Sequence, residues 1–206
     1  MSHLLPKGWP MAARRERTHF TIPGLQQQAS DKTVALLQER LVALIDLQLT
    51  LKHIHWNVVG PTFIGVHLML DPQVEAVEGM VDTTAERMAT MGASPNGLAG
   101  NIVATRTWDD YGLGRASVMQ HLGALDLAYA GVVEGHRKAI EKTDQLDPVT
   151  QDLLIGMAEQ LEQFHWFVRA HLETPEGVLL TEGAKDEESA AEQAARVDPG
   201  VQFAKR

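Results

Sequence analysis

Cysteine is absent from the 206 residues of this chain. Without thiolates there can be no disulfide framework, no iron–sulfur cluster, no thiolate zinc site and no cysteine nucleophile. Long apolar runs are lacking too, since no segment approaches membrane-spanning length and residues 1–20 have no signal-peptide core. These absences fit a reducing compartment, and we expect a cytoplasmic protein.

Basic residues are few, because 18 Lys and Arg stand against 27 Asp and Glu, for a formal charge of -9. Such a surface repels nucleic acid on average, so any DNA contact must come from a local basic segment. Residues 1–29 form such a segment, with one acid, Glu16, against the bases Lys7, Arg14, Arg15 and Arg17. We therefore expect an N-terminal basic tail over 1–29.

Helical periodicity fills four long segments, and no convincing strand pattern competes with it. Apolar residues recur at spacings of three, four and seven along the first segment, which ends at Gly60-Pro61. Pro72 lies inside the second segment and predicts a kink or a restart. The predicted helices cover residues 30–59, 64–91, 115–142 and 147–173.

The connection over residues 93–114 is too long for a tight turn between helices, so it must cross the molecule. A short helix is expected within it, at Thr107–Tyr111. Two helix pairs joined by a long crossover predict an all-α, ferritin-like four-helix bundle over residues 30–175. Residues 176–206 hold seven acids and four bases with few large apolar groups, which predicts an acidic, flexible tail, disordered or at most a frayed helix.

Histidines and carboxylates gather around the first predicted helix connection. His55 lies near the end of the first helix, and His67 and Asp71 follow in the second, four residues apart. Asp82 and Glu86 form another pair at a spacing of four, which places both on one helix face. Neutral imidazole with hard carboxylates and no thiolate suits Fe, Mn or Zn.

Distance limits how these residues can combine. His67 and Asp82 are fifteen residues apart, which is roughly 22 Å along a helix, so one ion cannot touch both. His55 can reach His67 because both lie close to the Gly60-Pro61 turn. One chain therefore offers a half site of His55, His67 and Asp71. If two chains lie antiparallel across a two-fold axis, Asp82 and Glu86 of one complete the half site of the other, which makes a dimer the smallest functional unit.

Structural explanations compete with this metal site. A histidine on an apolar stripe, such as His55, is usually a hydrogen-bonded core residue. Acids spaced by four are usually a solvated helix face, and Arg87 and Arg106 are conceivable partners for Glu86. His53 is expected to point to another side of its helix. Glu162 and His165 have the spacing of an in-bundle di-iron motif, but it occurs once, so we expect His165 to face solvent or pack in the core.

The motif LKHIHWNVVG at residues 51–60, with FIGVH at 63–67, resembles the Dps family. So do the positions of Asp71, Asp82 and Ala85-Glu86-Arg87, and the likeness extends over roughly residues 20–175, through RTWDDY at 106–111 and HWF at 165–167. Dps proteins are ferritin-like iron-storage proteins of bacteria, named for DNA protection in starved cells. The resemblance implies a hollow dodecamer that oxidises Fe(II) with hydrogen peroxide and stores Fe(III) oxyhydroxide inside.

The resemblance also assigns roles to residues. It implies a ferroxidase centre at the two-fold interface, with His55, His67 and Asp71 from one chain and Asp82 and Glu86 from its neighbour. Trp56 would lie beside the iron and absorb oxidising equivalents. The alternative explanation is that Trp56 is a plain core aromatic, and the two roles can coexist.

Lys52 matches a position that pairs with the acid corresponding to Asp71, or it is a plain surface lysine. Asp152 best matches the acids that line the three-fold iron pores. Asp147, which precedes Pro148, is explained as a helix N-cap.

Two other functions fit the sequence. One is a non-specific DNA-binding nucleoid protein with weak or absent ferroxidase activity, using the N-terminal tail. The other is a metal-binding scaffold without oxidase activity, such as a zinc-loaded shell.

Overall fold

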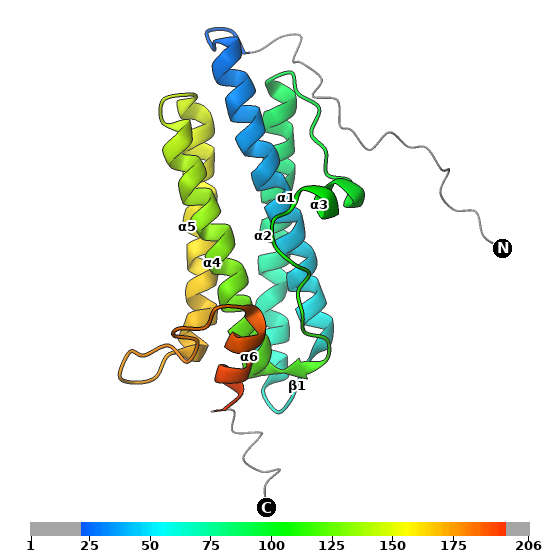
Figure 1. The fold of residues 1–206 in the computed structure, drawn as a ribbon, viewed down its shortest axis with the longest axis vertical. Helices are drawn as coiled ribbons and strands as arrows, with labels where there is room; N and C mark the ends of the chain where they lie inside the picture. Colours follow the sequence, from blue (N-terminus) through cyan, green and yellow to red (C-terminus); the bar gives the residue numbers. More distant parts are fainter. Residues whose placement is uncertain (1–21, 197–206) are drawn as a thin grey trace, which may run out of the picture.

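The computed structural model describes residues 22–196, which form an elongated bundle of helices (Figure 1). Two long antiparallel pairs make up the bundle: α1 (Gln27–Asn57) with α2 (Phe63–Thr90), and α4 (Val118–Thr143) with α5 (Pro148–Leu172). The predicted all-α, ferritin-like bundle is confirmed. Among the described helices, none is long and apolar enough to cross a membrane.

The core follows the predicted apolar stripes. Buried leucines line one side of α1, and the predicted apolar residues of α5 are buried except Leu153, which is partly covered. The main residues that the two helices contribute are Leu37, Leu41, Leu44, Leu51, Leu154, Met157, Leu161, Phe164 and Val168.

Helix α2 continues through Pro72 as one helix, so the predicted restart does not occur. A proline removes the hydrogen bond to the carbonyl four residues earlier, here that of Leu68. Pro72 and Leu68 are both exposed, so water can satisfy this carbonyl. At the end of α2, Gly92 adopts a φ of 82°, a left-handed conformation that glycine tolerates and that closes the helix.

The crossover between α2 and α4 carries its short helix earlier than predicted. Helix α3 spans Ala99–Thr105, and the expected helix at Thr107–Tyr111 is wrong. Side-chain contacts to α1 explain the difference, because Asp46 accepts hydrogen bonds from Arg106 at 3.1 Å and from the Trp108 indole at 2.6 Å. These bonds hold the chain extended over α1. The crossover ends in β2 (Ala116–Ser117), which pairs in parallel with β1 (Val58–Val59).

The C-terminal region differs most from the expectation of a flexible tail. Residues Glu187–Ala195 form helix α6, with a complete capping box between Asp186 and Ser189. Three of its four alanines, Ala190, Ala191 and Ala194, are buried against the bundle. Residues 197–206 lie outside the described residues, as do residues 1–21 of the predicted basic tail; the rest of that tail is structured, since α1 begins at Gln27.

Candidate metal centre

The turn between α1 and α2 brings His55 and His67 into direct contact. Helix α1 ends at Asn57, two residues before its predicted end, because Val58–Val59 form β1; Gly60, at a φ of 119°, and Pro61 then reverse the chain. The two imidazole rings stack with their centroids 3.7 Å apart. The predicted proximity of the two histidines is therefore confirmed.

Each histidine ring is oriented by the backbone of the other. His55 Nδ1 lies 3.0 Å from the His67 carbonyl oxygen, and His67 Nδ1 lies 2.9 Å from the His55 carbonyl oxygen. A carbonyl oxygen only accepts, so each Nδ1 carries the proton and each Nε2 keeps its lone pair. A hydrogen bond that fixes the tautomer in this way is the usual support of a metal-binding histidine. The pair thus offers two Nε2 ligands.

Asp71 lies beside the histidine pair, one turn after His67 on α2. Its Oδ1 accepts a hydrogen bond from Lys52 Nζ at 3.1 Å and lies 3.3 Å from His55 Nδ1. The predicted pairing of Lys52 with Asp71 is confirmed. The hydrogen bond from Lys52, helped by the charge of that lysine, lowers the pKa of Asp71 and outweighs the opposing effect of burial. The carboxylate is therefore ionised and half-exposed, as a ligand for a cation should be.

Asp82 and Glu86 lie on the same helix but far from this half site. Because α2 is continuous, about 22 Å of helix separates His67 from Asp82. Both carboxylates are exposed, and neither takes part in an ion pair within residues 22–196. Arg87 and Arg106, the conceivable partners of Glu86, are bound elsewhere.

One chain thus stacks His55 on His67, sets Asp71 beside His55 and leaves Asp82 and Glu86 far from all three. In the part of the chain that the structure describes, no three histidine or acidic side chains converge well enough to hold a metal ion. A complete site would need ligands from a second chain.

Trp56 is not a core aromatic, since 71% of it is exposed. It belongs to an apolar surface at the α1–α2 turn, next to the histidine pair. Ile64 and Leu68, at 52% and 59% exposure, continue this surface along α2, with Phe63 at 41%. This surface was not predicted from the sequence, although Ile64 and Leu68 are four residues apart and lie off the stripe of the buried Val66 and Leu70. We call Trp56, Phe63, Ile64 and Leu68 the turn patch.

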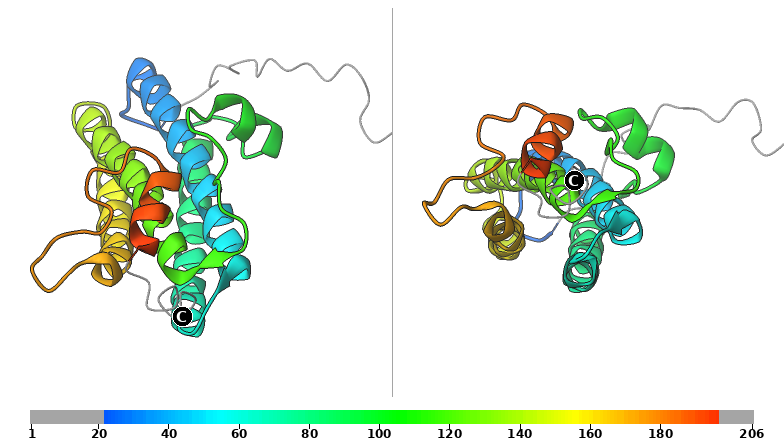
Figure 2. Two further views of the ribbon diagram at one scale, coloured as in Figure 1. Left: turned by 60° about the horizontal axis from the view of Figure 1, so that its bottom comes forward. Right: turned by 90° about the horizontal axis from the view of Figure 1, so that it is seen from below.

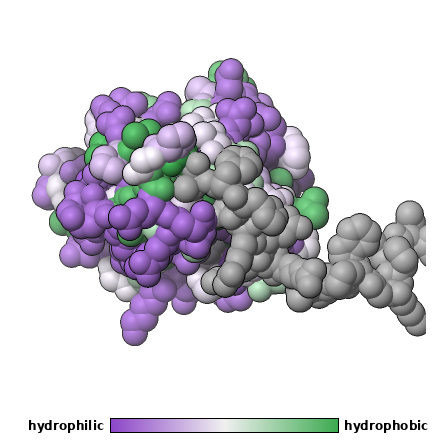
Figure 3. All heavy atoms as spheres, turned by 90° about the horizontal axis from the view of Figure 1, so that it is seen from above, coloured by the Kyte–Doolittle hydropathy of each residue, from purple (hydrophilic) through white to green (hydrophobic). Residues whose placement is uncertain are grey.

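The acids at the α4–α5 turn separate into a structural residue and an exposed one. Asp147 caps α5 by accepting from the Thr150 backbone N–H, and its carboxylate accepts from Arg87 at 2.6 Å. The predicted N-cap is confirmed. Asp152 is exposed near the same end of the bundle, whose surface is largely hydrophilic (Figure 3).

The other histidines considered are bound within the fold. His53 Nε2 contacts the Leu113 carbonyl at 2.7 Å, on the crossover side of α1. His165 Nε2 lies 2.7 Å from Asp126 Oδ1 and the ring is mostly buried, so His165 packs in the core, which was one of its two expected positions. Glu162 turns away from His165 to pair with Arg137 at 2.7 Å.

Comparison with known proteins identifies the family. The ferritin-like domain profile matches residues 34–178. A DNA protection during starvation protein from Mycolicibacterium smegmatis is 57% identical over 179 residues, covering 87% of this chain and 98% of its own length. The chain belongs to the Dps proteins of the ferritin-like family.

Solved structures give the same result for the Dps fold. Mycobacterium smegmatis Dps superimposes with a TM-score of 0.80 at 58% identity, covering 81% of this chain and 95% of its own. DpsA14 from Streptomyces coelicolor gives 0.79 at 54% identity, with 80% and 98% coverage. A further Dps relative bears a different name, the fine tangled pili major subunit of Haemophilus ducreyi, which is 49% identical over 157 residues, 76% of this chain and 83% of its own length.

Proposed function

We propose that this protein oxidises and stores iron, at sites shared between two subunits. The observation that carries the proposal is the reciprocal hydrogen bonding of His55 and His67, which leaves the Nε2 lone pair of each ring free, with the ionised Asp71 next to the His55 ring. Two imidazoles and a carboxylate suit Fe(II). The half site and the turn patch lie at the same end of the α1–α2 pair, so an association that covers the patch would also bring a second chain to the site.

The second half of the site would come from the neighbouring subunit. In an antiparallel pair, the partner subunit's Asp82 and the partner subunit's Glu86 would supply the missing carboxylates. Their exposure and their lack of an ion pair among residues 22–196 support this assignment. Twelve such subunits forming a shell, as the family resemblance implies, would enclose the stored mineral.

Fe(II) is the substrate of the proposed reaction. Two Fe(II) ions each give one electron to hydrogen peroxide, whose O–O bond breaks. With two water molecules, the products are two FeO(OH) units and four protons, which balances atoms and charge. Transfer of both electrons to one peroxide avoids the hydroxyl radical that one-electron reduction releases. The protein supplies ligands and position, while the redox change belongs to iron. Trp56, exposed beside the site, could trap a stray oxidising equivalent.

The assay that tests this proposal is anaerobic loading of Fe(II) onto the assembled protein, followed by hydrogen peroxide. Ferric absorbance and hydroxyl-radical trapping are recorded together. We expect oxidation much faster than in buffer, with little radical trapped. Oxidation no faster than in buffer would contradict the proposal and favour a scaffold that binds metal without oxidising it.

Asp152 and the N-terminal segment extend the proposal. Exposed Asp152, at the α4–α5 end of the bundle, is our proposed pore residue for iron entry. DNA contact, which the names of the relatives suggest, is proposed for the basic residues in 1–19, outside the described residues. Binding of this kind would act through phosphate charge and weaken steeply with salt. A cytoplasmic location fits both activities.

A further inference from the structure

Helix α6 is seated closely on α4 (Figure 2). Its contact residues are alanines, and Ala190 and Ala194 face Gly123 of α4. A Cβ atom at Gly123 would lie 2.6 Å from the Ala190 carbonyl oxygen and 2.9 Å from the Ala194 Cβ. Only glycine permits this approach, so the two helices are matched in shape. Small side chains also mean that little apolar area holds α6 in place.

The segment that leads to α6 is attached to α4 and α5 by its own hydrogen bonds, separately from the α6 contacts. Thr181 donates a hydrogen bond to Asp126 Oδ2 at 2.6 Å, and the other oxygen of Asp126 contacts His165 at 2.7 Å. Thr181 and Asp126 are buried. Residues up to 181 therefore stay attached to α4 and α5 whether or not α6 is docked. The hinge would lie in residues 182–186, where Gly183 has a φ of 79°.

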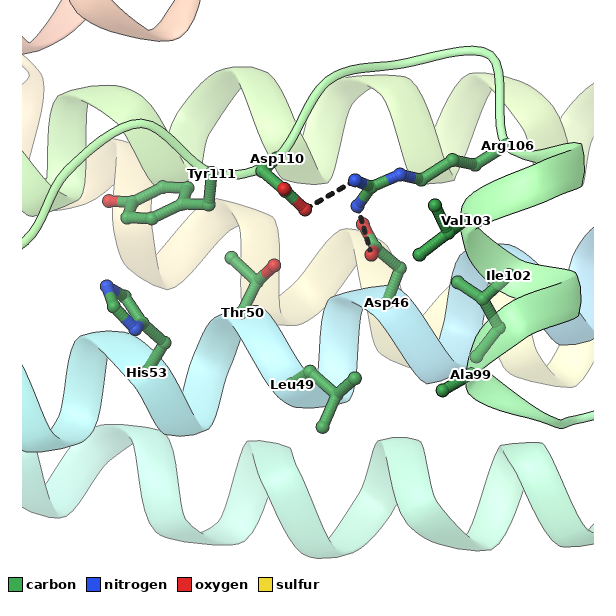
Figure 4. A pocket seen from close by; sticks show the side chains of 10 residues that line it. All are labelled: Asp46, Leu49, Thr50, His53, Ala99, Ile102, Val103, Arg106, Asp110 and Tyr111. Carbon is green, nitrogen blue, oxygen red and sulfur yellow. Dashed lines mark hydrogen bonds and ion pairs between the residues drawn. The ribbon is translucent and has the colours of Figure 1, made fainter. Parts of the chain in front are cut away.

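The first turn of α6 places a carboxyl group in an unfavourable environment. Glu187 is partly buried against the crossover, where the Gly112 backbone donates to it. The groups that face it are Tyr111 from the crossover and Asp46 from α1. The nearby cation Arg106 is already bound by Asp46 and Asp110, as Figure 4 shows. Within residues 22–196, Glu187 has no ion-pair partner.

Burial is the main cause that raises the pKa of Glu187 to about 7. The hydrogen bond from Gly112 lowers this pKa, and the negative charge of Asp46 raises it further. Tyr111 hydrogen-bonds His121 of α4, and burial lowers the pKa of His121 to about 4, so no positive charge comes from that side at neutral pH. On α6 itself, the neighbouring Asp186 and Glu188 are exposed acids. Every group around Glu187 that is not already paired is therefore neutral or negative.

We propose that α6 is a clasp that is docked on α4 while Glu187 is protonated and detaches when Glu187 ionises. The docked carboxyl holds its proton up to about pH 7, whereas a detached one ionises in its ordinary acidic range. Docking is thus strongest below that range and weakens as pH rises toward 7. By linkage, the docking equilibrium falls about tenfold between roughly pH 6 and 8. Release would free residues 187–196 from the bundle.

Hydrogen exchange of the α6 amides in the full-length assembled protein tests the clasp. Wild type, Glu187→Gln and Glu188→Gln are compared at each pH, so that the chemical pH dependence of exchange cancels. Gln is neutral like protonated Glu, so we expect Glu187→Gln to stay protected while wild type loses about tenfold in protection. Glu188→Gln, altered at an exposed neighbour, should follow wild type.

Several outcomes would overturn the clasp. One is that the protection of the α6 amides changes with pH in the same way in wild type and Glu187→Gln. The others are that Glu187→Gln is unprotected at every pH, or that protection in Glu188→Gln does not change with pH. Gly123→Ala serves as the reference for a detached helix, because its added methyl meets backbone atoms. It should leave the α6 amides unprotected at every pH, while Thr181 and the bundle remain protected. Loss of protection throughout the bundle would contradict independent fastening of the two parts.

Discussion

Replacing His55 with Ala should lower the rate of Fe(II) oxidation by about a hundredfold or more, because loss of outer support alone costs metal sites ten- to a hundredfold. The substitution removes one Nε2 ligand. It also removes the ring that stacks on His67 at 3.7 Å, so the remaining histidine loses its orientation. The measurement is the initial rate of ferric absorbance after peroxide addition to the loaded protein.

His171→Ala is the matched control for this variant. His171 is an exposed histidine near the end of α5, bonded only to the Phe167 carbonyl among the described residues, and its removal should leave the rate unchanged. An unchanged rate in His55→Ala would contradict the assigned ligand. Gel shifts with DNA test the alternative function, a DNA-binding nucleoid protein. That alternative would be favoured if the wild type oxidised no iron and the His55→Ala variant still bound DNA.

Placing glutamates at Ile64 and Leu68 together should abolish pairing of the subunits through the turn patch. Both side chains are more than half exposed, so the substitutions cost little inside one chain. In an interface they would bury two charges per subunit without partners, which typically costs several kcal/mol each. We expect light scattering to detect smaller assemblies and the iron assay to lose nearly all activity, although His55, His67 and Asp71 are untouched.

Val178→Glu, an exposed apolar position in the loop after α5, is the control for added surface charge. It should keep both assembly and activity. Circular dichroism checks that the double variant keeps its helical content and is therefore folded. If the folded double variant assembles like the wild type, the subunit contact lies outside the turn patch.

Local patterns were sufficient for much of this molecule. The apolar stripes with Gly60-Pro61 and Asp147-Pro148 predicted the long helices, because periodicity and caps act within a few residues. The half site was predictable for the same reason, since a single turn joins His55 to His67.

Contacts between distant residues decided the rest. The prediction of a short helix at 107–111 was wrong because Asp46, about sixty residues earlier, accepts hydrogen bonds from Arg106 and Trp108. An acidic composition predicted a flexible C-terminal tail, yet small alanines fit against Gly123. Trp56 was compatible with a core by residue type alone, and only the packing of α1 against α2 leaves it exposed. None of these contacts has a local signature.

The central claim, that each iron site combines two subunits, is tested most directly by mixing two inactive variants. His55→Ala disables one half of a site and Asp82→Asn the other. In a two-fold pair of one chain of each kind, one site carries both substitutions and the other carries neither. Random pairing makes half of the pairs mixed, so about a quarter of all sites should be intact.

The two chains are refolded together from denaturant, and the mixture is compared with each variant refolded alone. We predict recovery of about a quarter of the wild-type oxidation rate, against near-background rates for the separate variants. A mixture no more active than the average of the two variants would contradict an intersubunit site.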